Sequence, residues 1–244
     1  SHVVFLRRLG LRLSVTDRIC RERKPLGIIF LGGSREDFSE DTSSFKVPCV
    51  IVTTSAENWS MEELSSVSID DEKAGETIVD YLIDHGHTKI AEIGANLELS
   101  QTAILRHNGY LNSFKKHGIT PDERYYEKAR FSYDSAYHAM KKLLEKDIEI
   151  TAVYAISDVM AIGAIRAILD KGLRVPDDIS ITGFDGSTLA EYYNPKIVSI
   201  RQPHKDMAAH SVELLFSMID LHKGSCHEII PFELTEGESV ARIN

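Results

Sequence analysis

Three side chains in this sequence have the chemistry to hold a ligand with neighbouring hydroxyl groups. Arg106 supplies a planar guanidinium that can donate to two adjacent oxygens, Asp185 a carboxylate that accepts from hydroxyls, and Phe131 a ring that can cover C–H bonds. Taken singly, Arg106 could equally form a surface ion pair, and Phe131 could belong to a core. Each lies near the predicted end of a strand or the start of a helix, which favours a shared binding site.

Asp185 closes the most informative stretch of the chain. Residues 179–186 are Ile-Ser-Ile-Thr-Gly-Phe-Asp-Gly, and they follow Val-Pro-Asp-Asp at 175–178. Apolar residues between turn-forming Pro, Asp and Gly predict a short buried strand with Asp185 at its carboxyl end. In an open parallel α/β sheet, ligands bind at that end because helices cover both faces. A strand followed by an Asx-type turn is the simpler alternative.

Composition and charge narrow the possible functions. The chain has 244 residues, 43% of them hydrophobic and 27% charged, which is ordinary for a globular protein of one large or two modest domains. A formal net charge of -9 argues against wrapping nucleic acid or lying on an anionic membrane. The basic cluster within residues 7–24 is expected to be a solvated helix face. Without an apolar run of membrane-spanning length or a signal peptide, a cytoplasmic protein is expected.

The sequence offers little for a metal, a cofactor or catalysis. Cys20, Cys49 and Cys226 are odd in number and widely separated, which suits reduced thiols better than disulfides. The histidines lack a convincing second half-site, so no metal is expected. The chain has no Gly-x-Ser-x-Gly, no phosphate-binding glycine loop and no Gly-x-Gly-x-x-Gly after a strand. We therefore expect neither a cofactor nor enzymatic activity.

Strand-like and helix-like segments alternate along almost the whole chain. Short apolar runs bounded by turn residues indicate strands, whereas apolar residues at helical spacing before a glycine indicate helices. Such alternation predicts parallel sheets with right-handed crossovers. The expected strands are 3–6, 27–31, 47–52, 90–93, 129–131, 151–156, 179–185, 197–200 and 228–234, and the expected helices are 14–24, 70–85, 102–117, 135–146, 159–171 and 205–222.

A set of motifs carries a family resemblance through its order and spacing. The segments are Gly27–Phe30, Ser68–Asp71, Ala74-Gly75, Leu82–Ile90, Arg106, Gly109-Tyr110, Ala155–Ala164, Gly172–Ser180, Gly183–Asp185, Pro195 and Gln202-Pro203. Each segment alone is weak, but together they resemble the effector-binding core of the LacI/GalR family of bacterial transcription regulators. The resemblance covers most of the chain.

The resemblance implies a periplasmic-binding-protein-like α/β fold, in which two doubly wound parallel-sheet subdomains are joined by three crossing segments and hold a small molecule between them. The N-terminal subdomain would comprise residues 1–67 and 203–227, and the C-terminal one 68–202 and 228–244. The expected function is the ligand-sensing core of a transcription regulator, a repressor, that binds a small sugar or sugar derivative and forms a homodimer. The implied effector-binding positions are Arg106, Asp185, Phe131, Gln202, Ser157, Asp158, Thr53, Ser100 and Thr102.

Two departures from the family pattern change these expectations. The helix-turn-helix, the hinge helix, and the first strand and helix of the core have no counterpart. The N-terminal subdomain is therefore expected to be incomplete, and operator DNA to be bound only through the missing N-terminal segment. Thr53 stands where many sugar-responsive members carry an acid, and Ser157 where they carry asparagine. Fewer hydrogen-bonding groups suggest a ligand with fewer hydroxyls, a phosphorylated or modified sugar, or a site that has drifted.

The alternative to a transcription regulator is a solute-binding protein of a sugar ABC transporter, which would share the fold.

Overall fold

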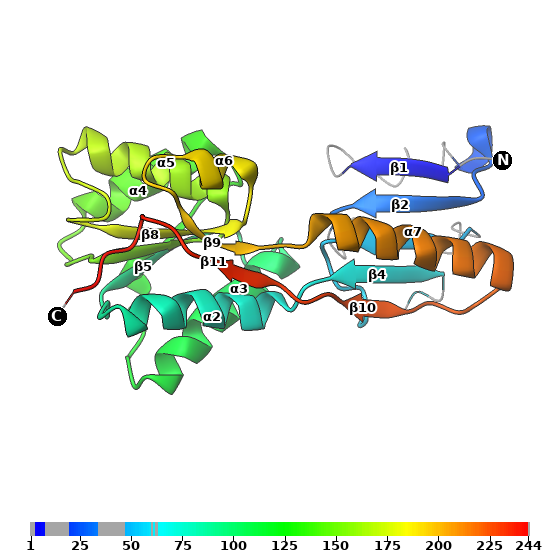
Figure 1. The fold of residues 1–244 in the computed structure, drawn as a ribbon, viewed down its shortest axis with the longest axis horizontal. Helices are drawn as coiled ribbons and strands as arrows, with labels where there is room; N and C mark the ends of the chain where they lie inside the picture. The colour runs from blue at the N-terminus through cyan, green and yellow to red at the C-terminus, as the bar shows by residue number, and fades with distance from the viewer. Residues whose placement is uncertain (1–2, 8–19, 34–46, 60, 62, 244) are drawn as a thin grey trace. The chain divides into compact units, whose positions relative to one another are not determined.

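The computed structural model describes residues 3–7, 20–33, 47–59, 61 and 63–243. The chain divides into two compact units, shown as ribbons in Figure 1. Unit 1 comprises Ser1–Asp70 and Pro203–Pro231, and unit 2 comprises Asp71–Gln202 and Phe232–Asn244. The chain therefore passes between the units three times, and the first and last boundaries lie a few residues beyond the predicted ones.

Unit 1 is built on a parallel sheet with the described strands in the order β1-β2-β3-β4-β10. Helix α7 (His204–Leu221) packs against β2, β3 and β4. Gly27 faces Leu215 of α7, so Ile28 and Phe30 point to the opposite face, where they join Trp59 in a buried cluster. The strands are β1 (Val3–Arg7), β2 (Gly27–Leu31), β3 (Cys49–Val52), β4 (Leu64–Ser68) and β10 (His227–Ile229).

Unit 2 is built on a larger sheet with the described strands in the order β11-β9-β8-β7-β5-β6. All neighbours are parallel except β11, which runs antiparallel to β9. Strands β5, β7 and most of β8 are buried, as expected of strands covered by helices on both faces. The strands are β5 (Ile90–Gly94), β6 (Tyr126–Lys128), β7 (Ala152–Ala155), β8 (Ser180–Asp185), β9 (Val198–Arg201) and β11 (Glu233–Thr235).

The helices of unit 2 cover its sheet in two pairs. Helices α2 and α3 pack together on one face, and α4 and α5 pack together on the other (Figure 1). Serines at 100, 132 and 157 cap α3, α4 and α5, each accepting a hydrogen bond from a backbone N–H of the first turn. The helices are α2 (Asp71–Asp84), α3 (Gln101–Lys116), the 3-10 turn η3 (Glu123–Tyr125), α4 (Tyr133–Glu145), α5 (Asp158–Asp170) and α6 (Thr188–Tyr192).

Helices α2 and α3 approach closely because glycines lie where they meet. A Cβ atom on Gly75 of α2 would lie 2.6 Å from the backbone oxygen of Arg106 in α3, and a Cβ on Gly109 would overlap the backbone of Glu72. The contact brings the backbone of Arg106 directly against the first turns of α2. The glycine spacing therefore sets the position of the arginine that the sequence singled out.

The predicted fold class, with its two parallel-sheet units, is confirmed, but one central strand was not predicted. Strand β4 contains three serines and so lacks the apolar run by which the other strands were found. It is nevertheless buried along its length. Ser65 donates to the Met218 sulfur, and the Ser66 hydroxyl bonds to His227, so tertiary partners satisfy these polar groups.

Other predicted elements differ in place or number. The predicted strand 129–131 is wrong, since β6 lies just before it at Tyr126–Lys128. The predicted final strand, 228–234, is two strands separated by Pro231: β10 pairs with β4 in unit 1, and β11 pairs with β9 in unit 2. Helix α6 was not predicted. Most of the predicted helix 14–24 lies outside the described residues, and its described part is helical from Cys20 to Arg23.

Gly109→Ala should destabilise unit 2, because the added methyl group meets the α2 backbone and cannot be accommodated by a side-chain rotation. Overpacking of this kind costs about 1–3 kcal/mol, to be measured by urea denaturation. Gly224→Ala in unit 1 is the matched control, since a Cβ there meets nothing within 4 Å. Equal stability of the two variants would contradict the proposed tight contact between α2 and α3.

Candidate functional site

The centre of the site in unit 2 is the buried guanidinium of Arg106, which is held from two sides. Its Nε donates to Asp71 Oδ1 at 2.8 Å, and its Nη1 donates to the backbone carbonyl of Ile156 at 2.6 Å. The Arg106 side chain is only 4% exposed. Burial disfavours the charge, but Asp71 and Asp185 raise the pKa of Arg106, so the guanidinium stays charged. It is thus fixed before any ligand binds.

The ring of Phe184 fixes the plane of this guanidinium. The Arg106 Cζ atom lies 3.5 Å from the ring centroid, which is a close cation–π contact. Phe184 belongs to β8 and is fully buried. Because successive residues of a strand point to opposite faces, Phe184 meets α3, whereas its neighbour Gly183 meets Asp158 of α5.

Asp185 is the more accessible charged group of the site. Its Oδ1 accepts from Gln202 Nε2 at 2.7 Å and lies 3.8 Å from Arg106 Nη1. The Asp185 side chain is 35% exposed, and its φ of 110° lies in a region that residues other than glycine rarely adopt. Strain of this kind clusters at functional sites. We call Arg106, Asp71, Asp185, Gln202 and Phe184 the Arg106 cluster.

Asp158 and Ser157, both predicted to contact a ligand, hold the backbone in this structure. Asp158 is 1% exposed; its Oδ2 accepts from the Ser187 N–H at 2.6 Å and its Oδ1 from the Ser199 hydroxyl at 2.7 Å. Burial raises the pKa of Asp158, against the hydrogen bonds from Ser199 and Ser187, which lower it. Ser157 caps α5. Asp158 thus anchors the loop that follows Asp185.

The remaining predicted residues lie at the ends of other elements. Phe131 follows β6 and is 42% exposed, so it does not belong to the core. Ser100 caps α3 and is mostly buried, and Thr102 is half-buried in the first turn of that helix. Thr53 lies in unit 1, directly after β3, with a φ of 72°. A positive φ in a β-branched residue is a backbone outlier.

Sequence reasoning missed Asp71 and Phe184. Asp71 lies within the motif Ser68–Asp71 and opens α2, so a signal existed, but the motif indicates a helix start rather than a partner for Arg106. Phe184 precedes Asp185 in an apolar strand, a pattern that by itself predicts only a core residue. The three-dimensional contact with the guanidinium gives it a role at the site.

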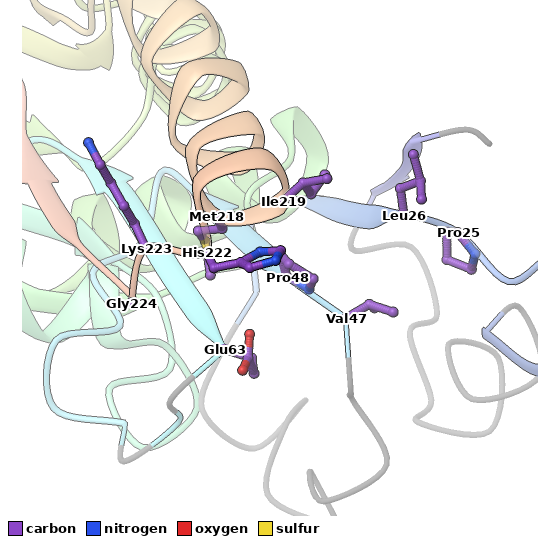
Figure 2. Close-up of a pocket in the computed structure, with 10 residues that line it drawn as sticks. All are labelled: Pro25, Leu26, Val47, Pro48, Glu63, Met218, Ile219, His222, Lys223 and Gly224. Carbon is purple, nitrogen blue, oxygen red and sulfur yellow. The ribbon is translucent and has the colours of Figure 1, made fainter.

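A pocket of about 480 Å³ lies elsewhere, in unit 1 (Figure 2). It is lined at one end by Met218 and His222, from the end of α7, and by Pro48 and Glu63, which precede β3 and β4. It therefore lies at the amino ends of these strands, opposite the carboxyl ends where α/β sheets bind ligands. Its lining is mostly apolar, and we do not assign the effector to it.

Two further observations concern the described part of the chain. Its His, Cys, Asp and Glu side chains form no group of three that could hold a metal ion. In the same residues, no helix combines the length and apolar character that crossing a bilayer requires.

Comparison with known proteins identifies the class of this domain. A family model for the periplasmic binding protein-like domain matches residues 79–240. The HTH-type transcriptional regulator MalR of Clostridium butyricum is 38% identical over 225 residues, which cover 91% of this chain and 67% of that protein. Catabolite control protein A of Priestia megaterium is 36% identical over 190 residues, covering 78% of this chain and 56% of its own length.

A solved structure agrees with these relatives. The transcriptional regulator CelR in complex with cellobiose superposes with a TM-score of 0.83 and 26% identity, covering 98% of this chain and 84% of that one. The fold and the matching family model define a periplasmic-binding-protein-like domain. The chain belongs to the LacI/GalR family of bacterial transcription regulators. These relatives are named as regulators, which gives the transport-protein alternative no support.

Asp158→Ala should destabilise unit 2 by about 1–3 kcal/mol, because the Ser187 N–H and the Ser199 hydroxyl lose a buried acceptor. Chemical denaturation measures the change. Asp134→Ala is the control: it also removes a carboxylate from the first turn of a helix, but that side chain is 89% exposed. If both variants lost the same stability, Asp158 would have no special anchoring role.

Proposed function

We propose that this chain is the ligand-sensing core of a LacI-type repressor, and that its effector is a small sugar or sugar derivative bound by the Arg106 cluster. The observation that carries the proposal is the pairing of a fixed buried cation with a partly exposed carboxylate. Arg106 donates hydrogen bonds to Asp71 and to the backbone carbonyl of Ile156, and Asp185 lies beside it at the carboxyl end of β8.

This pairing suits a polyhydroxylated ligand. A hydroxyl both donates and accepts, so neighbouring hydroxyls can donate to the Asp185 carboxylate and accept from the guanidinium. Because both groups are held by packing and hydrogen bonds, little side-chain entropy is lost on binding. Gln202 steadies the carboxylate through its side-chain amide.

Four other residues belong to the proposed site by prediction rather than by contact with the cluster. Phe131 is exposed enough to cover a sugar ring. Ser100 is the N-cap of the helix that carries Arg106, and Thr102 lies in the first turn of that helix. Thr53 is the predicted contribution of unit 1. Ser157 and Asp158 act indirectly, by holding the backbone that carries Asp185 and its loop.

The relatives support a sugar as the effector and DNA as the target. One relative is solved as a cellobiose complex, and others are named HTH-type regulators. We propose that operator DNA is bound through a helix-turn-helix that precedes this domain in the whole regulator. The net charge of this chain is -9, the sign that the phosphates of DNA repel.

Asp185→Ala should weaken sugar binding by about 1–3 kcal/mol, roughly tenfold to a hundredfold, because buried donors of the ligand and of Gln202 lose their acceptor. Calorimetry against cellobiose, maltose, glucose, ribose and glucose 6-phosphate measures the loss and ranks the ligands.

Asp178→Ala is the matched control. Its side chain is 32% exposed, close to the value for Asp185, but it pairs only with Arg174 on the surface of unit 2 in the contacts described. The control should bind as the parent does. Unchanged sugar affinity in Asp185→Ala would remove Asp185 from the site.

We also propose a homodimer, as a regulator that reads a two-fold operator requires. Helix α7 of unit 1 leaves Val212 and Phe216 exposed, and these two residues share one face of the helix because they are four positions apart. Exposed apolar side chains of this kind are common at subunit interfaces.

Light scattering at micromolar concentration should give twice the mass of one chain. Phe216→Glu should shift the equilibrium toward the monomer, because a charge in an apolar interface loses its water. Tyr192→Glu, an exposed aromatic residue of unit 2, should leave the mass unchanged. A parent that stays monomeric would contradict the proposal.

A further inference from the structure

The peptide that joins Asp185 to Gly186 is held from both sides by the neighbouring strand. The carbonyl of Asp185 accepts from the Gln202 N–H at 3.2 Å, and the N–H of Gly186 donates to Ser199 Oγ at 3.1 Å. Ser199 lies in β9, and Gln202 directly follows that strand. Because the C=O and N–H of one trans peptide point in opposite directions, these two bonds together fix its plane.

This peptide lies in a turn with an unfavourable backbone. Asp185 has a φ of 110° and Gly186 a φ of 62°, and only the glycine adopts such a value without cost. Strain of this kind persists only where the surrounding structure enforces it. The turn lies directly against β9, because a Cβ atom on Gly186 would lie 2.5 Å from the Arg201 Cα atom. Contacts from β9 are therefore the ones that can keep Asp185 in its strained conformation.

The Ser199 hydroxyl makes two bonds at this turn, one as a donor and one as an acceptor. It donates to Asp158 Oδ1 at 2.7 Å while it accepts from the Gly186 N–H. The Ile200 carbonyl, at 3.4 Å, is a more distant acceptor for the same proton. Ser199 is only 1% exposed, so both bonds are shielded from water. A hydroxyl can accept from an N–H and donate to a carboxylate through one atom, whereas an alanine side chain can do neither.

The position of this hydroxyl is itself fixed by Asp158. The Asp158 carboxylate packs against the backbone of β8, where Gly183 leaves room for it: a Cβ atom on that glycine would overlap Oδ1. The second oxygen, Oδ2, accepts from the Ser187 N–H. The amides of two successive residues, Gly186 and Ser187, are thus bonded directly to Ser199 and to Asp158. Each link from the buried carboxylate to Asp185 is a hydrogen bond or a peptide bond.

We propose that Ser199 is a positioning residue for Asp185: its hydroxyl fixes the peptide that follows Asp185 and so directs the carboxylate toward the effector. The effect on the backbone follows from the contacts of Ser199 alone, whereas the effect on binding rests on the proposed role of Asp185 in holding a sugar. Gln202 completes the arrangement, since its side-chain amide donates to the Asp185 carboxylate and its backbone N–H donates to the carbonyl of the same residue.

The first arm of the test needs no ligand. By NMR, the three-bond coupling between the amide and α protons of Asp185 reports φ, and hydrogen exchange of the Gly186 amide reports its bond to Ser199. In Ser199→Ala the coupling should change, because the turn can relax toward negative φ. The Gly186 amide should exchange about tenfold faster or more, because it loses its acceptor. Ser199→Thr retains the hydroxyl and should keep the parental values of both.

Ser180→Ala is the matched control. Ser180 is equally buried, and its hydroxyl also accepts a backbone N–H, that of Ala241 at 2.9 Å, but it lies at the amino end of β8, roughly 16 Å along the strand from Asp185. The control should also lose stability, yet leave the coupling and the exchange at residues 185 and 186 unchanged. Equal changes in both variants, or none in Ser199→Ala, would overturn the positioning role. So would a Gly186 amide that exchanges freely in the parent, even if Ser199→Ala did not fold.

A second arm tests the link to binding. For whichever sugar of the panel binds the parent, the Kd should rise about tenfold in Ser199→Ala, because the carboxylate is no longer held in its binding position. The Kd should stay within about twofold of the parental value in Ser199→Thr and in Ser180→Ala. If the Asp185 coupling changes in Ser199→Ala while the Kd does not, Ser199 positions Asp185 as proposed but Asp185 does not contact the sugar, and the proposed binding site fails instead.

Discussion

Much of unit 2 depends on the buried ion pair between Arg106 and Asp71. A guanidinium taken out of water is tolerated only where it is paired and hydrogen-bonded, because an isolated buried charge costs several kcal/mol. Asp71 can reach it because α2 and α3 meet at Gly75 and Gly109 without intervening side chains. The close contact between α2 and α3 and the burial of the Arg106 charge therefore depend on each other. If the two helices separate, the guanidinium loses Asp71.

The other half of the site depends on how β8 ends. Asp185 and Gly186 both have positive φ, so the chain turns sharply at the carboxyl end of the strand. Asp158 holds that turn from the α5 face through Ser187 and Ser199, whereas Arg106 packs on Phe184 from the α3 face. Two buried charges of opposite sign thus fix one strand end from opposite sides, and they leave the Asp185 carboxylate partly exposed.

Most of this architecture could be predicted from the sequence, since apolar runs and closing glycines such as Gly86 mark elements by local rules. Strand β4 was not predicted because two of its serines, Ser65 and Ser66, are satisfied by partners far along the chain, which no local pattern shows. The same limit applied at the site. Arg106 and Asp185 were predicted by residue type, but whether a carboxylate faces a ligand or a backbone N–H depends on tertiary contacts. At Asp158, for example, the sequence could not show that the carboxylate accepts from the Ser187 N–H and the Ser199 hydroxyl.

The central claim is that the Arg106 cluster of unit 2 recognises the effector. A crystal structure of this chain with a bound sugar tests it most directly, since it shows the partners of each hydroxyl. The account predicts a ligand hydroxyl within hydrogen-bond distance of the Asp185 carboxylate and another within that distance of the Arg106 guanidinium, with the Arg106–Asp71 bond intact. A sugar that touches neither side chain, for example one seated in the unit 1 pocket beside Pro48 and His222, would contradict it.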